Sequence, residues 1–223
     1  MSDLCVIFDL DGTLVDSEGL CNQAYLDLLP QLAGHGITLD ELVLRFRGRK
    51  MALIVSELEQ ILGTTLHSDF VPEYRQHVAH LFSTCLQPMP GVPEMLAQLR
   101  SPFCIASSGP LAKIRDALTV TGLLHFFEGR IFSAYEVGSW KPDPGLFLHA
   151  AQAMGTEPGR CVVVEDSPVG VEAAQAAGMF ALQYLPGTEE AHPYATLFND
   201  MSLLPTLLHQ RVMHLHEGAG LES

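Results

Sequence analysis

The sequence has 223 residues, of which 48% are hydrophobic, and a formal net charge of -14 at pH 7. A chain of this length can bury one sizeable core with a smaller subdomain beside it. The acidic balance disfavours nucleic acid as a partner, because its phosphates would be repelled over most of the surface. No window approaches the roughly 18 continuous apolar residues of a membrane span, and no basic region leads into an apolar run at the N-terminus. We therefore expect a cytoplasmic protein with no nucleic-acid or membrane partner, a small-molecule ligand, and a monomeric or small homo-oligomeric state.

Five short apolar runs, each bounded by turn residues, predict strands that are buried on both faces of a sheet. The runs cover residues 4–8, 103–107, 130–134, 161–165 and 179–185. From the second run onward they alternate with helical patterns that end at a glycine or a turn. This alternation predicts an α/β, Rossmann-like core of three layers, in which helices cover both faces of a parallel sheet.

The stretch between the first and second predicted strands has a different pattern. Residues 17–87 have helical periodicity throughout and contain no strand-like run. Such a stretch is far longer than a crossover helix, and it predicts a separate α-helical cap inserted after the first strand. The expected domains are a core of residues 1–16 and 88–223 and a cap of residues 17–87. Hinges are expected near residues 14–18 and 87–91, where the cap leaves and rejoins the core.

Polar side chains follow four of the predicted strands at their carboxyl ends. In strand order they are Asp9 and Asp11, then Ser107 and Ser108, then Lys141 in the loop after the third strand, and finally Glu165 and Asp166. Taken singly, each has a structural explanation, because Asp and Ser also cap helices and form turns. Together they should meet at one edge of the sheet, where open parallel sheets bind their ligands. Four acids that converge without a cation would repel one another, which indicates a bound metal.

The residue types at this edge indicate phosphoryl transfer. Mg²⁺ prefers hard oxygen ligands and keeps water and substrate phosphate in its shell, so Asp9, Glu165 and Asp166 are suitable ligands. The Lys141 ammonium and the two serines could then bind the other phosphoryl oxygens. One aspartate can act as nucleophile and form an aspartyl phosphate, while a second acid moves protons. The spacing of Asp9 and Asp11 lets both lie near one centre in these separate roles.

Four motifs in order resemble the haloacid dehalogenase-like superfamily, specifically its phosphatases with a helical cap. They are DLDGTLVDS, the serine of IASSG, the lysine of KPDP, and the acidic pair of VVEDS followed by GVEAAQAAG. The resemblance covers essentially the whole chain. It implies that Asp9 is the nucleophile and a Mg²⁺ ligand, and that Asp11 is the general acid/base and ligates the metal through its main-chain carbonyl. By the same resemblance, Ser107 and Lys141 bind the transferring phosphoryl group, and Glu165 and Asp166 bind the metal.

The predicted cap carries a local basic segment, RFRGRK at residues 45–50, in an otherwise acidic chain. It resembles the cap loop of the branch that includes phosphoglycolate, sugar-phosphate and 6-phosphogluconate phosphatases and β-phosphoglucomutase. By that resemblance Arg49 or Lys50 could pair with a carboxylate of the substrate, such as that of 6-phosphogluconate. A phosphomutase of the β-phosphoglucomutase type remains an alternative. A non-catalytic phospho-receiver module is a more remote one, because its lysine ends the last strand. Asp11 argues against carbon–halogen and carbon–phosphorus cleavage, whose family members lack this acid.

Overall fold

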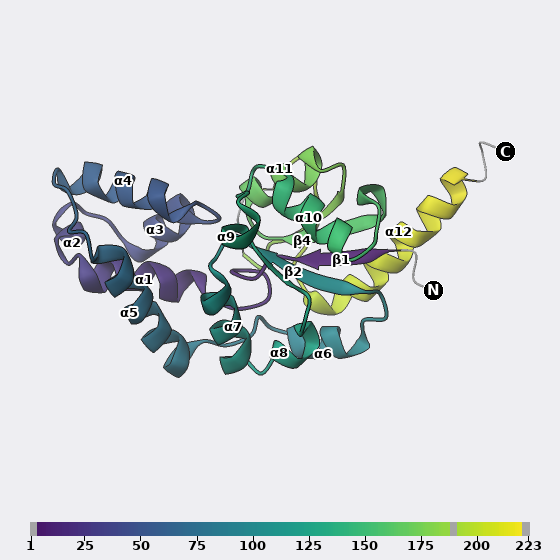
Figure 1. Ribbon diagram of the computed structural model, residues 1–223, viewed down its shortest axis with the longest axis horizontal. Coiled ribbons are helices and arrows are strands. Elements are labelled where there is room, and N and C mark those ends of the chain that lie inside the picture. The colour runs from purple at the N-terminus through teal and green to yellow at the C-terminus, as the bar shows by residue number, and fades with distance from the viewer. Residues whose placement is uncertain (1–3, 188–190, 220–223) are drawn as a thin grey trace.

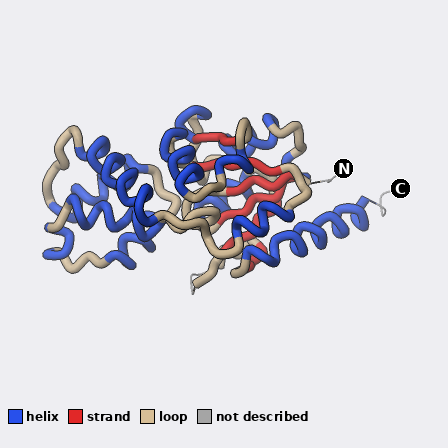
Figure 2. The backbone as a smooth tube through the Cα atoms, turned by 90° about the horizontal axis from the view of Figure 1, so that it is seen from below, coloured by secondary structure: helices blue, strands red, loops and turns tan. Residues whose placement is uncertain are grey.

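The computed structural model describes residues 4–187 and 191–219. Its centre is one sheet, drawn in red in Figure 2. The strands are parallel and follow the order β3-β2-β1-β4-β5-β6. The strands are β1 (Cys5–Phe8), β2 (Phe103–Ser107), β3 (Ile131–Ser133), β4 (Cys161–Glu165), β5 (Phe180–Tyr184) and β6 (Thr196–Phe198). The order of the chain through the sheet reverses at β1, which pairs with β2 on one side and β4 on the other. The five strands expected from the sequence are confirmed.

Helices cover both faces of the sheet. One face packs against α6 (Val92–Gln98), α7 (Leu111–Val120), α8 (Leu124–Phe127) and α12 (Leu204–Ala219), and the other against α9 (Ala134–Val137), α10 (Gly145–Ala153) and α11 (Pro168–Ala176). Two short 3₁₀ turns, η1 (Pro158–Arg160) and η2 (Met201–Leu203), precede β4 and α12. Alternate residues of β1 point to opposite faces, so Val6 and Phe8 join one apolar cluster and Ile7 joins the other. The three-layer α/β core is therefore confirmed.

The segment between β1 and β2 begins with five helices that gather at one end of the molecule (Figure 1). They are α1 (Glu18–Leu28), α2 (Gln31–Gly34), α3 (Leu39–Phe46), α4 (Met51–Leu62) and α5 (Phe70–Cys85). The two connections to the sheet run side by side. The Asp16 amide donates to the Gln87 carbonyl at 3.0 Å, and the Met89 amide donates to the Leu14 carbonyl at 2.9 Å. We call residues 17–87 the helical insert.

The elements not expected from the sequence include the edge strand β6, the short helices α8 and α9, and the last helix α12. The strand has only three residues, and Leu197 at its centre is 47% exposed, so no apolar run marks it. Among the described residues, no helix combines the length and apolar character needed to cross a bilayer.

Candidate active site

A cavity of about 320 Å³ lies between the carboxyl ends of the strands and the helical insert. All seven core residues singled out from the sequence line it, namely Asp9, Asp11, Ser107, Ser108, Lys141, Glu165 and Asp166. This convergence follows from the topology, because the carboxyl ends of neighbouring parallel strands meet beside β1.

The turn after β1 brings two aspartates to the cavity. The Asp9 amide still belongs to the sheet, since it donates to the Val164 carbonyl at 2.9 Å. The chain then turns sharply at Gly12, whose φ of 75° favours glycine. A Cβ at this position would lie 2.5 Å from Oδ2 of Asp166, so a side chain would also collide with the acid at the end of β4. Gly12 therefore lets the turn after β1 pack directly against Asp166.

Lys141 is buried between two carboxylates. Its Nζ donates to Oδ1 of Asp9 at 2.5 Å and to Oε1 of Glu165 at 2.6 Å. Burial raises the pKa of Asp9 to about 7, although the nearby ammonium acts in the opposite direction. Burial alone would lower the pKa of Lys141, but the two carboxylates raise it, so the ammonium stays charged. One cation thus links the ends of β1 and β4.

Glu165 is held by the start of helix α11. Its Oε2 accepts hydrogen bonds from the main-chain amide and the hydroxyl of Ser167, at 2.7 and 2.8 Å. Gly170 gives the carboxylate room, because a Cβ there would lie 1.9 Å from Cδ of Glu165. Both oxygens of Glu165 therefore already accept hydrogen bonds, and the side chain fixes the position of Lys141.

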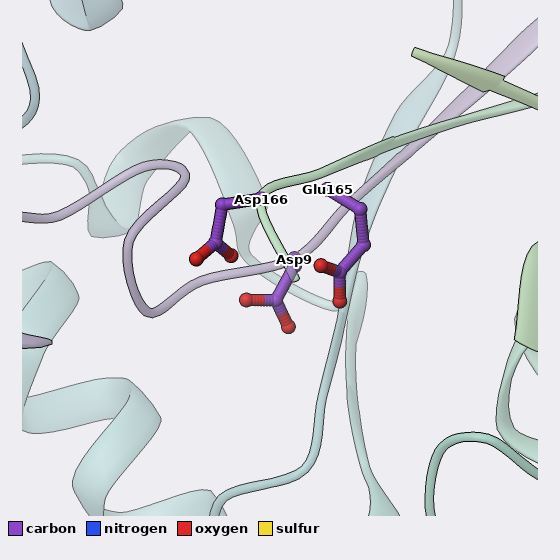
Figure 3. A group of neighbouring side chains, drawn as sticks. All are labelled: Asp9, Glu165 and Asp166. Carbon is purple, nitrogen blue, oxygen red and sulfur yellow. The ribbon is translucent and has the colours of Figure 1, made fainter. Parts of the chain in front are cut away.

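The carboxylates of Asp9, Glu165 and Asp166 form a group that could hold a metal ion. Each offers an oxygen within 4.8 Å of the others, and Figure 3 shows them converging from the ends of β1 and β4. Burial, together with the Glu165 charge, raises the pKa of Asp166 well above its usual value. Burial is the main cause of both raised pKa values, and a cation bound between the carboxylates would favour their charged forms. An oxygen donor set of this kind fits a hard divalent cation.

The two serines after β2 differ in their hydrogen bonding. Ser107 Oγ accepts from the Gly109 amide at 3.1 Å, which shapes the turn. The Ser108 hydroxyl is buried and has no hydrogen-bond partner among the described residues. A buried hydroxyl without a partner is costly, and an anion bound in the cavity would provide one.

The carboxylate of Asp11 accepts hydrogen bonds from Ser17 and Lys113, and Lys113 was not predicted as a site residue from the sequence. Its Oδ1 accepts from Ser17 Oγ at 2.6 Å and from Lys113 Nζ at 2.8 Å. Burial alone would raise the pKa of Asp11, but the Lys113 charge and these hydrogen bonds hold it below the usual value. Lys113 could have been noticed in the sequence, because the chain has only three lysines and this one closely follows the IASSG motif. The structure places it in the first turn of α7.

The charged side chains of the basic segment, residues 45–50, have different partners in the structure. Arg49 lines the cavity, where it pairs with Glu57. Lys50 does not line it; its ammonium lies 3.8 Å from the centre of the Trp140 ring. Arg47 reaches the core, with Nε 3.4 Å from Oδ2 of Asp166. Of the two substrate-binding candidates in this segment, the structure brings only Arg49 to the cavity.

The wall that the insert contributes is mainly apolar and aromatic. Tyr25 and Tyr74 stack with ring centres 4.3 Å apart, and Phe46, Met51 and Phe82 continue the same surface. The sequence predicted only that these residues lie in the helical stretch 17–87, and nothing in its periodicity identified the positions that face the cavity. Their role in the cavity wall was therefore not expected.

Comparison with known proteins gives consistent matches. A sequence model of the haloacid dehalogenase-like hydrolase family matches residues 4–178. The 6-phosphogluconate phosphatase of Escherichia coli (strain K12) is 36% identical over 208 residues, which are 91% of this chain and 93% of that protein. A haloacid dehalogenase-like protein of unknown function from Agrobacterium tumefaciens superimposes with a TM-score of 0.79 and 30% identity over 93% of this chain and 98% of that one. A putative β-phosphoglucomutase from Thermotoga maritima superimposes with a TM-score of 0.72 and 26% sequence identity, over 93% of this chain and 99% of that one. The resemblance found in the four sequence motifs is confirmed.

Proposed function

Because the chain belongs to the haloacid dehalogenase-like hydrolase family, we propose that it is a Mg²⁺-dependent phosphatase acting on a small phosphorylated sugar or sugar acid, such as 6-phosphogluconate. The observation that carries the proposal is the buried ammonium of Lys141, held between Asp9 and Glu165 with Asp166 alongside, at the floor of the cavity. This arrangement gives a phosphoryl group a cation, a nucleophile and a metal site at one point. The 6-phosphogluconate phosphatase relative supports the substrate class.

In the proposed reaction, Asp9 attacks the phosphorus atom and the bond from phosphorus to the ester oxygen breaks. In this step Asp11 must carry a proton, although its contacts with Lys113 and Ser17 lower its pKa in the substrate-free protein. It gives that proton to the leaving alkoxide, so the alcohol departs neutral. Water then attacks the aspartyl phosphate, Asp11 takes a proton from it, and the bond between Asp9 and phosphorus breaks to release phosphate. Lys141 and the Ser108 hydroxyl hold the oxygens of the transferring group in both steps. Asp9, Asp166 and the main-chain carbonyl of Asp11 would hold Mg²⁺, which stabilises negative charge on the phosphoryl oxygens.

We further propose that residues 17–87 act as the cap and that residues 1–16 and 88–223 form the catalytic core. The insert supplies an apolar wall over a polar floor, which would exclude water while the ester is cleaved. Its two connections pair through Asp16–Gln87 and Met89–Leu14, so both would have to move together when the site opens. Hinge motion at residues 14–18 and 87–91 accounts for entry of the substrate.

The experiment that tests the proposal measures phosphate release from a panel of phosphorylated metabolites that includes 6-phosphogluconate and phosphoglycolate. We expect activity with Mg²⁺, none with EDTA, and a loss of at least about 10³-fold in kcat for Asp9→Asn. Asp69→Asn is the matched control, because Asp69 is exposed and makes no side-chain capping hydrogen bond. Wild-type turnover in the Asp9→Asn variant would remove Asp9 from the nucleophile role.

A second candidate is a phosphomutase, which the structural match to the putative β-phosphoglucomutase supports. The same floor would serve it, because only the fate of the aspartyl phosphate differs. Incubation with β-glucose 1-phosphate separates the two: release of phosphate favours the phosphatase, and formation of glucose 6-phosphate favours the mutase. Membership of a hydrolase family argues against the receiver module.

A further inference from the structure

Four cationic side chains line the cavity, and three of them have partners that account for their positions. Lys141 lies between Asp9 and Glu165. Arg49 pairs with Glu57, and Arg75 donates to the Tyr135 hydroxyl at 3.3 Å. The fourth is Lys113, whose ion-pair partner is Asp11. Lys113 is therefore the cation that is paired with the proposed general acid/base, Asp11, whereas Lys141 is paired with the proposed nucleophile.

The ammonium of Lys113 lies between the core and the insert. Helix α7 begins directly after the segment that carries the two serines, so its first turn stands at the edge of the phosphoryl site. The Nζ atom lies 5.6 Å from the centre of the Phe82 ring in α5. The side chain is 25% exposed, and that exposed part belongs to the cavity wall. A leaving group attached to a phosphoryl at Asp9 would occupy the space beside it.

Lys113 and Ser17 hold Oδ1 of Asp11 in the structure. A single oxygen of Asp11 accepts from both Ser17 and Lys113, which directs the carboxylate toward these two donors. Proton transfer to the leaving group requires Asp11 within hydrogen-bond reach of the ester oxygen. A partner that attracts Lys113 elsewhere would free Asp11 for that role, and the flexible four-carbon stem of lysine permits the movement.

We propose that Lys113 recognises a carboxylate on the leaving group of the substrate and, by pairing with it, releases Asp11 for proton transfer. The inference rests on the proposed function and narrows its substrate class to phosphate esters with a second negative charge. On the insert side of the cavity, Arg49 is already paired with Glu57 and Arg75 donates to Tyr135, and the aromatic and aliphatic side chains carry no charge. A buried carboxylate without a partner is unfavourable, so we assign Lys113 to that role. A neutral leaving group offers no ion-pair partner, so Lys113 would stay paired with Asp11. The preference for a carboxylate thus comes from helix α7 of the core, and not from Lys50.

The test compares two substrates that differ at one carbon, 6-phosphogluconate with its carboxylate and glucitol 6-phosphate with a hydroxymethyl group. The measured quantity is the ratio of kcat/KM for the acid to kcat/KM for the neutral ester. We expect the wild type to favour the acid and Lys113→Met to lower the ratio by about 10- to 100-fold, the range for a lost charged hydrogen bond. Lys113→Arg keeps the charge and should retain most of the preference.

Two controls keep the result specific. Arg115→Met removes the same charge from an exposed position on the same helix and should leave the ratio unchanged. Lys113→Gln replaces the methionine variant if that one does not fold, and its ratio should fall in the same way. An unchanged ratio in the Lys113 variants, or a wild type without preference for the acid, overturns the inference while leaving the phosphatase intact. Absence of Mg²⁺-dependent phosphate release from any ester in the panel overturns the proposed function, and this inference with it.

Discussion

The floor and the wall of the cavity are built from different kinds of residue on different kinds of element. The floor consists of charged and hydroxyl side chains at strand ends, and Glu165 and Ser107 there are each only 1% exposed. The wall from the insert is aromatic and aliphatic, and it stands on helices that join the core through two paired connections. The sheet fixes the floor through its backbone, and under the proposed function the floor would carry out the chemistry. The wall depends on side-chain choice and on the docking of the insert, and under the same proposal it would act with Lys113 in selecting the substrate.

The two regions meet through cationic side chains of the insert. Arg47 reaches Asp166 at the floor, Lys50 lies over Trp140, and Arg75 lies over Tyr135 with its guanidinium 5.6 Å from the ring centre. Substitutions in the floor should therefore abolish activity. Substitutions at these contacts should change substrate binding instead.

The largest effect is expected from Lys141→Met in the floor. The change leaves Asp9 and Glu165 buried without the ammonium between them, which should cost about 3–5 kcal/mol of unfolding free energy. The phosphoryl group would also lose its cation, and kcat should fall by about 10²–10³-fold. Denaturant unfolding and steady-state kinetics measure the two effects. A variant with wild-type kcat would show that this lysine has no role in the reaction.

A smaller effect in the same region is expected from Gly170→Ala. The new methyl group would meet Cδ of Glu165 at 1.9 Å, so the carboxylate must move and Lys141 with it. We expect a loss of about 1–3 kcal/mol in stability from the crowding and a lower kcat. Gly159→Ala is the matched control, because nothing lies within 4 Å of its added methyl group and its φ is not positive. Equal stability of the two variants would contradict the packing of Glu165 against α11.

The raised pKa values of two carboxyl groups in the floor predict how Mg²⁺ binding depends on pH. The pKa of Asp9 is about 7 in the folded protein against 3.8 as its ordinary value, and that of Asp166 is also raised. The folded state thus binds protons more tightly, so these groups destabilise the metal-free protein progressively as pH rises from about 4 to about 7. Protons also compete with Mg²⁺, so its apparent affinity should fall as pH drops below 7. Melting temperatures with Mg²⁺ and with EDTA test this: the difference should be larger at pH 8 than at pH 5.5.

The sequence was most informative where backbone topology determines position. Asp9, Ser107 and Glu165 follow buried apolar runs, and parallel pairing necessarily brings such strand ends to one edge. The sequence did not predict strand β6, because the strand has only three residues and one of them is an exposed leucine. Neither its length nor its periodicity is typical of a buried strand. Only Phe198 of this strand is buried, and a single buried position forms no pattern that predicts a strand.

The direction in which individual side chains point could not be predicted from the sequence either. Arg49 and Lys50 are adjacent in one basic segment, yet one lines the cavity and the other lies on Trp140. Lys113 carries no motif, and its contact with Asp11 depends on how α7 is oriented after the two serines. Charge clustering predicted that the insert would meet an anion. The structure shows that a core helix brings its own cation to the same cavity.

The smallest effect is expected where the insert meets the core at Trp140. The Lys50 ammonium lies 3.8 Å from the ring centre, a contact worth about 0.5–2 kcal/mol. Trp140→Leu should therefore raise KM a few-fold with little change in kcat, because the floor is untouched while docking of the insert is weakened. Lys50→Met should have the same effect, and the double variant should be no worse than either single one, since both remove one contact. Additive losses in the double variant would mean that Lys50 also acts on the substrate, which would return it to the role expected from the sequence.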